Sequence, residues 1–438
     1  MSESSVPFRH PWPERMFGEV GSVTVGGTPS TSVPEFWGGA IPWMASGDVH
    51  SRVIDDVPTR ISGLGLRHSS SKVVDPPSVA VALAGQGRTR GTAAYVRCAL
   101  CTNQSVALLK GNPGELDAEY LLHNLSFRYS ELRSRSAGGG RAGLTKTILN
   151  QFPLPLPAVP EQSKIAEVLS AMARAIEETE ALIVKQQRIK TGLTQDLLTR
   201  GIDENGNLRS QKTHKFKESP LGRIPVEWNC MKLHQVLVQR PRNGLYKAAS
   251  LIGRGTLLVG QTSFTQDRRL DFSLCRRAVV SPSEIETFGL VFGDILVTRV
   301  FATVEGIGQP VLVDSPPEPA VYESNMLLLR PSASMIDSLL LFTWLRSEAT
   351  RRRVLRSANA SNQVSVNQAA LNSLPVPVPS FSEQKRISQA LGQLDAAVRC
   401  TDVTLQKLRL LKTGLMQDLL TGNRRVTALL EQREEVTT

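Results

Sequence analysis

The chain has 438 residues, of which 41% are hydrophobic and 21% charged, and its formal net charge is +11. This length suits two or three domains, and no run of eighteen apolar residues is present to span a membrane. The first residues lack the basic-then-apolar order of a secretory signal, so a cytoplasmic protein is expected. Five cysteines are too few for a disulfide framework, and the positive charge allows a nucleic-acid partner without establishing one.

The first part of the chain, residues 1–157, has the pattern of a mixed α/β domain. The apolar run "PSVAVAL" predicts a strand, because turn formers bound it on both sides. Residues 115–135 have the periodicity of an amphipathic helix. Cys98 and Cys101 form a lone C-x-x-C without the second ligand pair of a structural zinc site, so no metal site is predicted.

Residues 149–199 recur, without a gap, at residues 371–421, and 21 of the 51 positions are identical. Each copy begins with alternating prolines, which remove backbone donors and therefore predict an extended strap rather than a helix or a central strand. A helix should follow each strap, with Ser382 as the N-cap of the second. Glu161 and Glu383 then fall in the first turns, where the helix dipole favours anions.

The apolar positions after each strap step by four and three residues, which is the pattern of a coiled coil. We therefore predict two long helices, at 158–201 and 380–422, that pack antiparallel. Gly192 and Gly414 lie inside this pattern at a cost of about 1 kcal/mol each relative to Ala, which indicates a close contact or a kink. The predicted seam consists of Ile165, Leu169, Met172, Ile176, Ile183, Leu193, Leu197, Ile387, Leu391, Leu394, Val398, Leu405, Leu408, Leu415 and Leu419.

Residues 202–225 are polar, basic and rich in turn formers, as expected of a linker. Residues 226–379 again have a mixed α/β pattern, with the strand candidates "VFGDILVTRV" and "PVLVD" and an amphipathic helix near 335–357. The predicted fold class is α+β, with a pseudo-twofold internal duplication. Two unlike α/β domains are separated by an antiparallel two-helix coiled-coil spacer, and residues 423–438 form a tail.

This order resembles the specificity (S) subunit of type I restriction-modification systems. The resemblance is carried by "PLPLPAVPEQ" and "PVPVPSFSEQ" with the helices after them, by "GGTPSTSVPEFWGGAIPWMASGDV", and by "NGLYK" and "FGDILVTR". It implies that residues 1–157 and 226–379 are target recognition domains, each reading one half of a split DNA sequence. Because the two domains are unlike, the target should be asymmetric.

The resemblance further implies that the helices fix the gap between the half-sites and dock two methyltransferase (modification) subunits, which restriction subunits join. Residues expected at this docking site are Glu161, Gln162, Gly192, Glu383, Gln384 and Gly414. The chain itself is expected to be non-catalytic. Its "DPPS" at residues 75–78 places Ser78 where the aromatic of an amino-methyltransferase motif belongs, and no P-loop motif is present. S-adenosylmethionine, ATP and magnesium are therefore expected in the partner subunits.

Basic residues cluster after the amphipathic segment of each half, and guanidinium groups bind phosphate or guanine bidentately. The alternative is a solvated helix face paired with Glu131 or Glu348. The candidate DNA-binding residues of these clusters are Arg128, Arg133, Arg135, Arg141, Arg346, Arg351, Arg352, Arg353 and Arg356. Candidates in polar loops are Ser46, Asp48, Gln86, Arg88, Arg90, Gln261, Arg299, Asn362 and Gln363.

Three alternatives stay open at this point. The chain could serve a different methyltransferase-based defence system, act as a stand-alone DNA methyltransferase, or form a coiled-coil adaptor with no DNA role. The defective "DPPS" argues against the second, and the third predicts no sequence preference.

Overall fold

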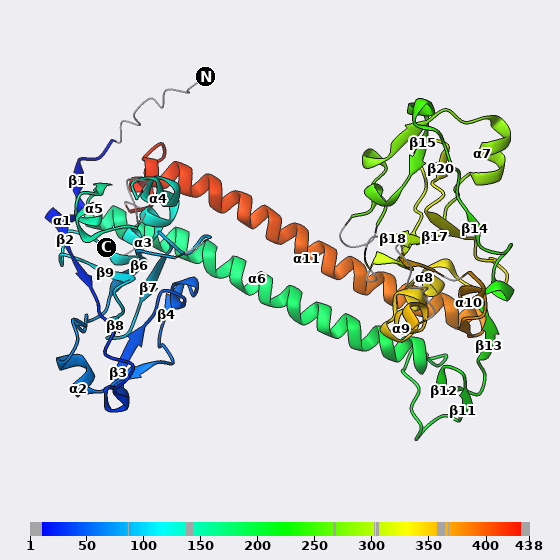
Figure 1. Cartoon of the computed structure of the whole chain (residues 1–438), viewed down its shortest axis with the longest axis horizontal. Helices are drawn as coiled ribbons and strands as arrows, with labels where there is room; N and C mark the ends of the chain where they lie inside the picture. The colour runs from blue at the N-terminus through cyan, green and yellow to red at the C-terminus, as the bar shows by residue number, and fades with distance from the viewer. Residues whose placement is uncertain are drawn as a thin grey trace. The chain divides into compact units, whose positions relative to one another are not determined.

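The computed structural model describes residues 11–85, 87–136, 143–265, 269–301, 303, 306–356, 364–366 and 368–430 (Figure 1). The chain forms two compact units: unit 1 comprises residues up to Ala181 and from Asp402 onward, and unit 2 comprises Leu182–Thr401. The boundary falls inside two long helices, α6 (Val159–Thr199) and α11 (Phe381–Thr421). Each unit therefore contains one of the two unlike α/β domains, which we call the variable domains, and a segment of both long helices. This is because the two ends of each helix pack on different domains.

Unit 1 is built on a five-stranded sheet in the order β2-β9-β6-β7-β4, with a three-stranded sheet β5-β3-β8 beside it. All five residues of β6 are buried, which explains why the sequence shows an unbroken apolar run there. The strands are β2 (Gly21–Val25), β3 (Trp37–Met44), β4 (Val53–Ile54), β5 (Arg60–Ile61), β6 (Ser78–Ala82), β7 (Ala93–Val96), β8 (Cys101–Thr102) and β9 (Val106–Gly111). The short helices are α1 (Phe17–Val20), η1 (Pro34–Phe36), η2 (Asp48–His50), α2 (Gly63–Arg67), α3 (Ala118–Phe127), α4 (Tyr129–Ser134) and α5 (Lys146–Asn150).

Unit 2 repeats this arrangement with a four-stranded sheet β14-β21-β17-β19 and a three-stranded sheet β16-β15-β20. In both three-stranded sheets the long strand pairs antiparallel on one side, through a register shift, and parallel on the other. The strands are β14 (Arg242–Asn243), β15 (Ile252–Val259), β16 (Arg276–Ala278), β17 (Ile295–Thr298), β18 (Val300–Phe301), β19 (Pro310–Leu312), β20 (Ala320–Tyr322), β21 (Met326–Leu329) and β22 (Val364–Ser365). The short helices are η3 (Leu233–Val236), η4 (Ala249–Leu251), η5 (Gln261–Ser263), η6 (Phe272–Leu274), α7 (Pro282–Phe288), α8 (Ser338–Arg346), α9 (Glu348–Arg356) and α10 (Gln368–Asn372).

The common strand order confirms the α+β duplication that the sequence predicts. The amphipathic segments differ from the prediction, because each is two helices rather than one. In unit 1, α3 and α4 are separated at Arg128, and in unit 2, α8 and α9 are separated at Ser347, whose backbone is extended. The Ser347 hydroxyl accepts a hydrogen bond from the Thr350 N–H at 3.4 Å, so it caps α9.

Both proline-rich straps are extended, as predicted, and each forms the second strand of a two-stranded sheet. β10 (Pro153–Pro155) pairs with β1 (Glu14–Met16), and β23 (Pro375–Val378) pairs with β13 (Asn229–Lys232), both antiparallel. A two-stranded sheet suits proline because each strand is an edge. The straps therefore join the start of each variable domain to the start of each long helix.

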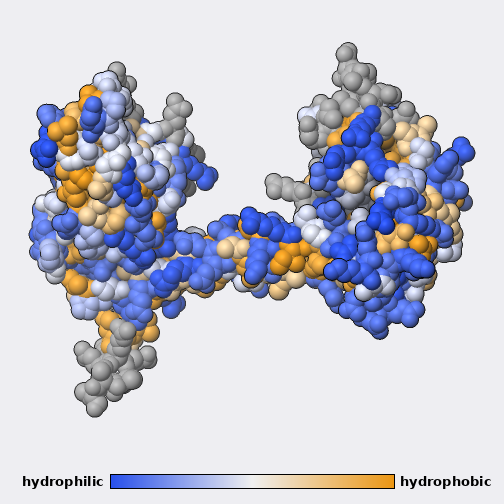
Figure 2. Space-filling view, turned by 90° about the horizontal axis from the view of Figure 1, so that it is seen from below, coloured by the Kyte–Doolittle hydropathy of each residue, from blue (hydrophilic) through white to orange (hydrophobic). Residues whose placement is uncertain are grey.

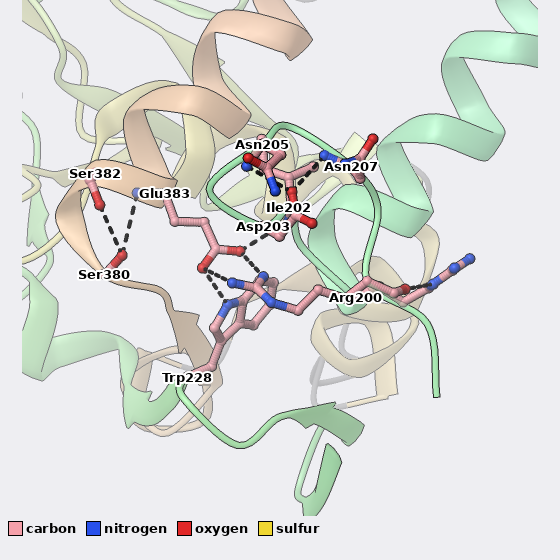
Figure 3. A network of polar contacts seen from close by, with 10 residues as sticks. Arg200, Ile202, Asp203, Asn205, Asn207, Trp228, Ser380, Ser382 and Glu383 are labelled. Atoms are coloured by element: carbon pink, nitrogen blue, oxygen red, sulfur yellow. Dashed lines mark hydrogen bonds and ion pairs between the residues drawn. The ribbon is translucent and has the colours of Figure 1, made fainter. Parts of the chain in front are cut away.

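The second long helix begins two residues earlier than Ser382 as the N-cap would require. Since α11 starts at Phe381, Ser380 is the N-cap, and its hydroxyl accepts from the Glu383 N–H at 3.4 Å. The prediction of Ser382 as the cap is wrong. The Ser382 hydroxyl instead lies 3.2 Å from that of Ser380, as Figure 3 shows.

Within each unit the two helix segments run antiparallel. In unit 1, Glu180 of α6 pairs with Arg409 of α11 at 2.7 Å, and in unit 2, Lys190 pairs with Asp395. The predicted seam positions are all buried or half-buried. The fully buried ones at the helix ends, such as Ile165 and Ile387, also pack into the cores of the variable domains.

The repeated "DLLT" at the end of each helix also packs into a variable-domain core. Leu197 and Leu198 join the core of unit 2, and Leu419 and Leu420 join the core of unit 1. Hydrophilic residues cover most of the surface seen in Figure 2. None of the helices in the described part of the chain combines the length and the apolar character of a membrane span.

Candidate nucleic-acid interface

In unit 1 the loop of residues 87–91, which comes after the buried strand β6, lies against α4. The Tyr129 hydroxyl donates to the carbonyl of Arg88 at 3.0 Å, and the guanidinium of Arg133 donates to the carbonyl of Gly87. Arg133 also donates to the Tyr129 hydroxyl at 2.7 Å. These contacts fix the loop through its backbone and leave the side chain of Arg88 exposed.

The helix η2 lies on the other side of the same loop. His50 Nε2 is 3.2 Å from the hydroxyl of Thr89. The Asp48 carboxylate accepts from the Ala45 N–H at 2.8 Å, so it closes the turn that presents Ser46, whose side chain is half-buried. Three segments that the sequence singles out separately therefore meet on one surface of unit 1.

Unit 2 brings the corresponding three segments together. The side-chain amide of Gln261, on η5, donates to the carbonyl of Val300 at 2.6 Å. Arg351, on α9, donates to the carbonyl of Ile307 at 2.7 Å. Arg351 thus holds the loop at residues 306–308 in the way that Arg133 holds the loop of unit 1. This agreement indicates one scaffold that carries different side chains in the two units.

The arginines of the second cluster divide into two groups. Arg353 donates to the carbonyl of Pro220 at 2.6 Å and Arg299 to that of Ser324 at 3.1 Å, so both help to fix the backbone. Arg346, Arg352 and Arg356 are exposed. Arg352 lies 3.6 Å from Glu348, and both side chains are more than 60% exposed, so this pair is weak.

In the first cluster, Arg128 belongs to the fold rather than to the surface. Its guanidinium forms a bidentate pair with Glu131, at 2.7 and 2.8 Å, and lies over the Phe152 ring. Arg135 also reaches Glu131, at 2.9 Å. Burial opposes ionisation of Glu131, but the hydrogen bonds and charges of the two arginines outweigh it and lower the pKa of Glu131. The paired alternative is therefore the correct one for Arg128, which is 13% exposed.

Five candidate residues of the two halves remain. Arg90 is half-buried at the end of the loop beside α4. Gln86, Arg141, Asn362 and Gln363 lie outside the described residues.

Two matching groups of side chains anchor the starts of the long helices. Glu161 accepts from the Trp12 indole at 3.2 Å and from Arg425 at 2.6 and 2.7 Å, and we name this group clasp 1. In clasp 2, Glu383 accepts from the Trp228 indole at 3.1 Å and forms a bidentate pair with Arg209.

In each clasp the glutamate belongs to one long helix and the arginine follows the other. The backbone N–H of Ile202 completes clasp 2 with a 3.0 Å bond to Glu383, and Figure 3 shows Glu383 pointing between Trp228 and Ile202. Gly201, two residues after the end of α6, has φ +65°. A Cβ there would lie 2.2 Å from the Glu383 carboxylate and 2.4 Å from Trp228, so the clasp requires glycine at this position.

The glutamine that follows each glutamate makes a second repeated set of bonds. Gln162 accepts from the Asp117 N–H at 2.8 Å and donates to two backbone carbonyls. Gln384 does the same with the Asp337 N–H at 2.7 Å. Asp117 and Asp337 are also the N-caps of α3 and α8. Each glutamine therefore fixes a domain helix to the start of a long helix.

This burial corrects the predicted docking role of four residues. Glu161, Gln162, Glu383 and Gln384 are at most 2% exposed, so they cannot offer a surface to a partner subunit. Gly192 and Gly414 differ, because both are exposed and a Cβ at either would meet nothing within 4 Å. Neither glycine is therefore required by a close contact within the chain.

In unit 1 a polar cluster that contains a buried histidine lies between the variable domain and the helices. His123 lies 2.9 Å from the hydroxyl of Ser170 and 3.4 Å from the guanidinium of Arg52. Burial, with the positive charges of Arg52 and Lys412, lowers the pKa of His123 to about 3. The position that corresponds to His123 in unit 2 is Thr343, six residues after the N-cap Asp337 as His123 is after Asp117.

Sequence reasoning missed the clasps and the contacts made by His50 and Tyr129. A signal for the clasps was present, because Trp12 and Trp228 are separated by the same 216 residues as Arg209 and Arg425. His50 and Tyr129 have no counterpart that would have marked them.

Both thiols of the C-x-x-C pair are held in the neutral form by burial, which raises their pKa values. Burial raises the pKa of the Cys101 thiol to about 11. Among the described residues, no group of three His, Cys, Asp or Glu side chains could hold a metal ion.

Comparison with known proteins agrees with this architecture. Residues 10–186 and 293–409 match the family model of the type I restriction modification DNA specificity domain. The type I restriction enzyme MjaVIII specificity subunit of Methanocaldococcus jannaschii is 24% identical over 315 residues, 72% of each chain. The EcoR124I/EcoR124II specificity subunit of Escherichia coli is 28% identical over 159 residues, 35% of this chain and 39% of the relative.

The fold is also that of a solved structure. The crystal structure of the type I restriction-modification system S subunit from M. genitalium superposes with a TM-score of 0.59 at 14% identity, over 95% of this chain and 98% of that one. The family match covers more than half of the residues, in both variable domains. The chain therefore belongs to the family of type I restriction-modification DNA specificity subunits.

Proposed function

We propose that this chain directs a type I restriction-modification complex to a bipartite, asymmetric DNA target, with each unit reading one half. The observation that carries this proposal is the repeated surface made by η2, the 87–91 loop and α4 in unit 1, and by η5, the 306–308 loop and α9 in unit 2. Arg133 and Arg351 fix the two loops through equivalent contacts. Since the side chains around these contacts differ, the two half-sites should differ.

The exposed arginines of these surfaces contact phosphates, and this part of binding is independent of sequence. We assign this role to Arg88, Arg346, Arg352 and Arg356. Arg133 and Arg351, which also hold the loops, support them, as does Arg135, which also pairs with Glu131. Base contacts come from the loops, and the proposed residues are Ser46, Gln86, Arg90, Arg141, Gln261, Arg299, Asn362 and Gln363.

The long helices fix the gap between the half-sites and dock two methyltransferase subunits. The support for docking is a surface on α11. There Gly414 leaves the backbone uncovered, and Leu410 and Leu411 are 74% and 52% exposed. Two adjacent exposed leucines near a glycine are the feature of α11 that best fits a partner surface. Methyl transfer, translocation and cleavage belong to the partner subunits, which bring S-adenosylmethionine, ATP and magnesium.

A domain exchange tests this proposal. Residues 11–157 are replaced by the corresponding segment of another family member, and the methylated motif is sequenced from cells that hold the matching modification subunits. One half of the motif should change and the other half and the gap should stay. A change in both halves, or in neither, would contradict the assignment of one half-site to each unit.

The stand-alone methyltransferase is tested separately with purified chain, labelled methyl donor and target DNA. Transfer is expected only after the modification subunits are added. Transfer by the chain alone would overturn the non-catalytic role. The genes beside the coding sequence distinguish a type I system from another methyltransferase-based system.

A further inference from the structure

The segment between the two halves, which the sequence marks only as a linker, is partly an ordered hairpin. Strand β11 (Phe216–Ser219) pairs antiparallel with β12 (Gly222–Pro225). The Ser219 hydroxyl closes the turn, donating to the carbonyl of Gly222 at 2.7 Å and accepting from the Leu221 N–H at 3.1 Å. Ile224 is 2% exposed, and it packs with Leu221 into the core of unit 2. One side of the hairpin is therefore anchored.

The exposed charged residues of the hairpin and of the segment before it are mostly basic. Residues 210–226 contain four Lys and Arg residues and a single acid, Glu218. Lys215, Lys217 and Arg223 are exposed. Glu218 lies 3.5 Å from Arg223, but the two side chains are 81% and 53% exposed, so their attraction is screened. Lys217 gives one hydrogen bond to the carbonyl of Val226 at 2.9 Å and keeps two donors for a ligand.

The turn of this hairpin touches the candidate DNA surface of unit 2. The Pro220 carbonyl, at the turn, accepts from Arg353 of α9 at 2.6 Å. On the same helix, Arg352 and Arg356 are exposed. The turn therefore brings the hairpin against the helix that carries these exposed arginines. In Figure 1, β11 and β12 lie beside α9 within unit 2.

We propose that the β11–β12 hairpin is an additional DNA-contacting arm of unit 2, which binds the phosphate backbone of double-stranded DNA beside one half-site. This inference rests on the proposed function, because its partner is the same DNA. Duplex DNA is favoured over an acidic protein because the arm adjoins α9. Lysine side chains are point charges on flexible stems, which suits phosphates rather than base edges.

The arm makes the protein's phosphate contacts unequal at the two half-sites. The described residues after α11, 422–430, contain no strand, and there Arg425 is committed to clasp 1. Unit 1 therefore has no equivalent of the arm in the described part of its tail. The contact should extend the footprint outside one half-site only and should not alter the sequence that is read.

The test is the salt dependence of DNA binding by the complex of this chain with its modification subunits. The variant is Lys215→Gln, Lys217→Gln and Arg223→Gln together, and the probe is a duplex that contains the methylated motif. The slope of log K against log salt should fall by about 2 to 3, because each phosphate contact contributes about 0.9. Phosphate-ethylation interference should be lost on one flank of one half-site, and the methylated motif should stay the same.

Two matched controls separate the arm from general charge and from folding. The variant Lys215→Arg, Lys217→Arg and Arg223→Lys keeps the charge and should keep the slope. The variant Lys185→Gln, Arg399→Gln and Lys407→Gln removes the same charge from exposed helix positions, and it should change the slope less. An equal change in this control, or an unchanged slope in the hairpin variant, would overturn the proposal. If the unmodified complex showed no preference for the motif, the proposed function itself would fail.

Discussion

Replacing Arg209 with alanine leaves the carboxylate of Glu383 buried without its positive partner. The two side chains are 9% and 3% exposed, so water cannot take the place of the guanidinium. The indole of Trp228 and the N–H of Ile202 remain as donors at 3.1 and 3.0 Å. Removal of one member of a buried ion pair costs about 3–5 kcal/mol.

This loss should appear as a lower unfolding temperature of unit 2. For a unit of this size each kcal/mol lowers the midpoint by about 2–4 °C, so we expect a decrease of about 6–20 °C. The full-length chain is heated, and unfolding is followed by tryptophan fluorescence, which Trp228 reports directly. Arg425→Ala in clasp 1 should cost less, because the Arg425 side chain is 42% exposed.

The double variant Arg209→Ala, Glu383→Gln is the decisive control. Neutralising the carboxylate removes the buried charge, so the double variant should recover part of the stability that Arg209→Ala loses. An Arg209→Ala variant as stable as the unmodified chain would refute the reasoning. A double variant that is less stable than the single one would refute it as well.

Three further predictions concern other parts of the molecule. Because the pKa of His123 is about 3 when folded and about 6.5 when unfolded, its contribution to stability is complete above pH 6.5 and falls as the pH drops toward 3. By pH 5 the free energy of unfolding should decrease by about 2 kcal/mol, and urea unfolding of a His123→Gln variant should lack this decrease. Gly192→Ala and Gly414→Ala should each stabilise the isolated chain by up to about 1 kcal/mol in thermal unfolding, and weaker binding of methyltransferase subunits by these variants would support docking there. Arg352→Ala with Arg356→Ala should lower the salt slope of DNA binding by about 2 without changing the unfolding midpoint, and an unchanged slope would remove both residues from the interface.

The duplication, the straps and the long helices could be predicted from the sequence, because each depends on local periodicity. Alternating prolines exclude helix whatever surrounds them, and a seam of apolar residues at heptad spacing requires a partner helix. The breaks at Arg128 and Ser347 could not be predicted, since they depend on which side chains each segment meets. The cap at Ser380 rather than Ser382 is a difference of two residues between two serines that the sequence does not distinguish.

The sequence predicted which segments form the candidate site, but not which of their residues face the solvent. Both clusters contain arginines that face the solvent and arginines that hold the backbone, and composition treats them alike. Arg128 illustrates this, because its partners Glu131 and Phe152 become neighbours only after folding. Glu161 and Gln162 illustrate the opposite error: repeated polar residues suggested a partner surface, but they are repeated because both halves fold in the same way.

The most direct test of the central claim is the methylation pattern of the source genome, with and without the gene for this chain. We predict that deletion removes one motif, made of two different short sequences separated by a gap of fixed length. Loss of a continuous or palindromic motif, or no change in methylation while the modification subunits are present and active, would contradict it.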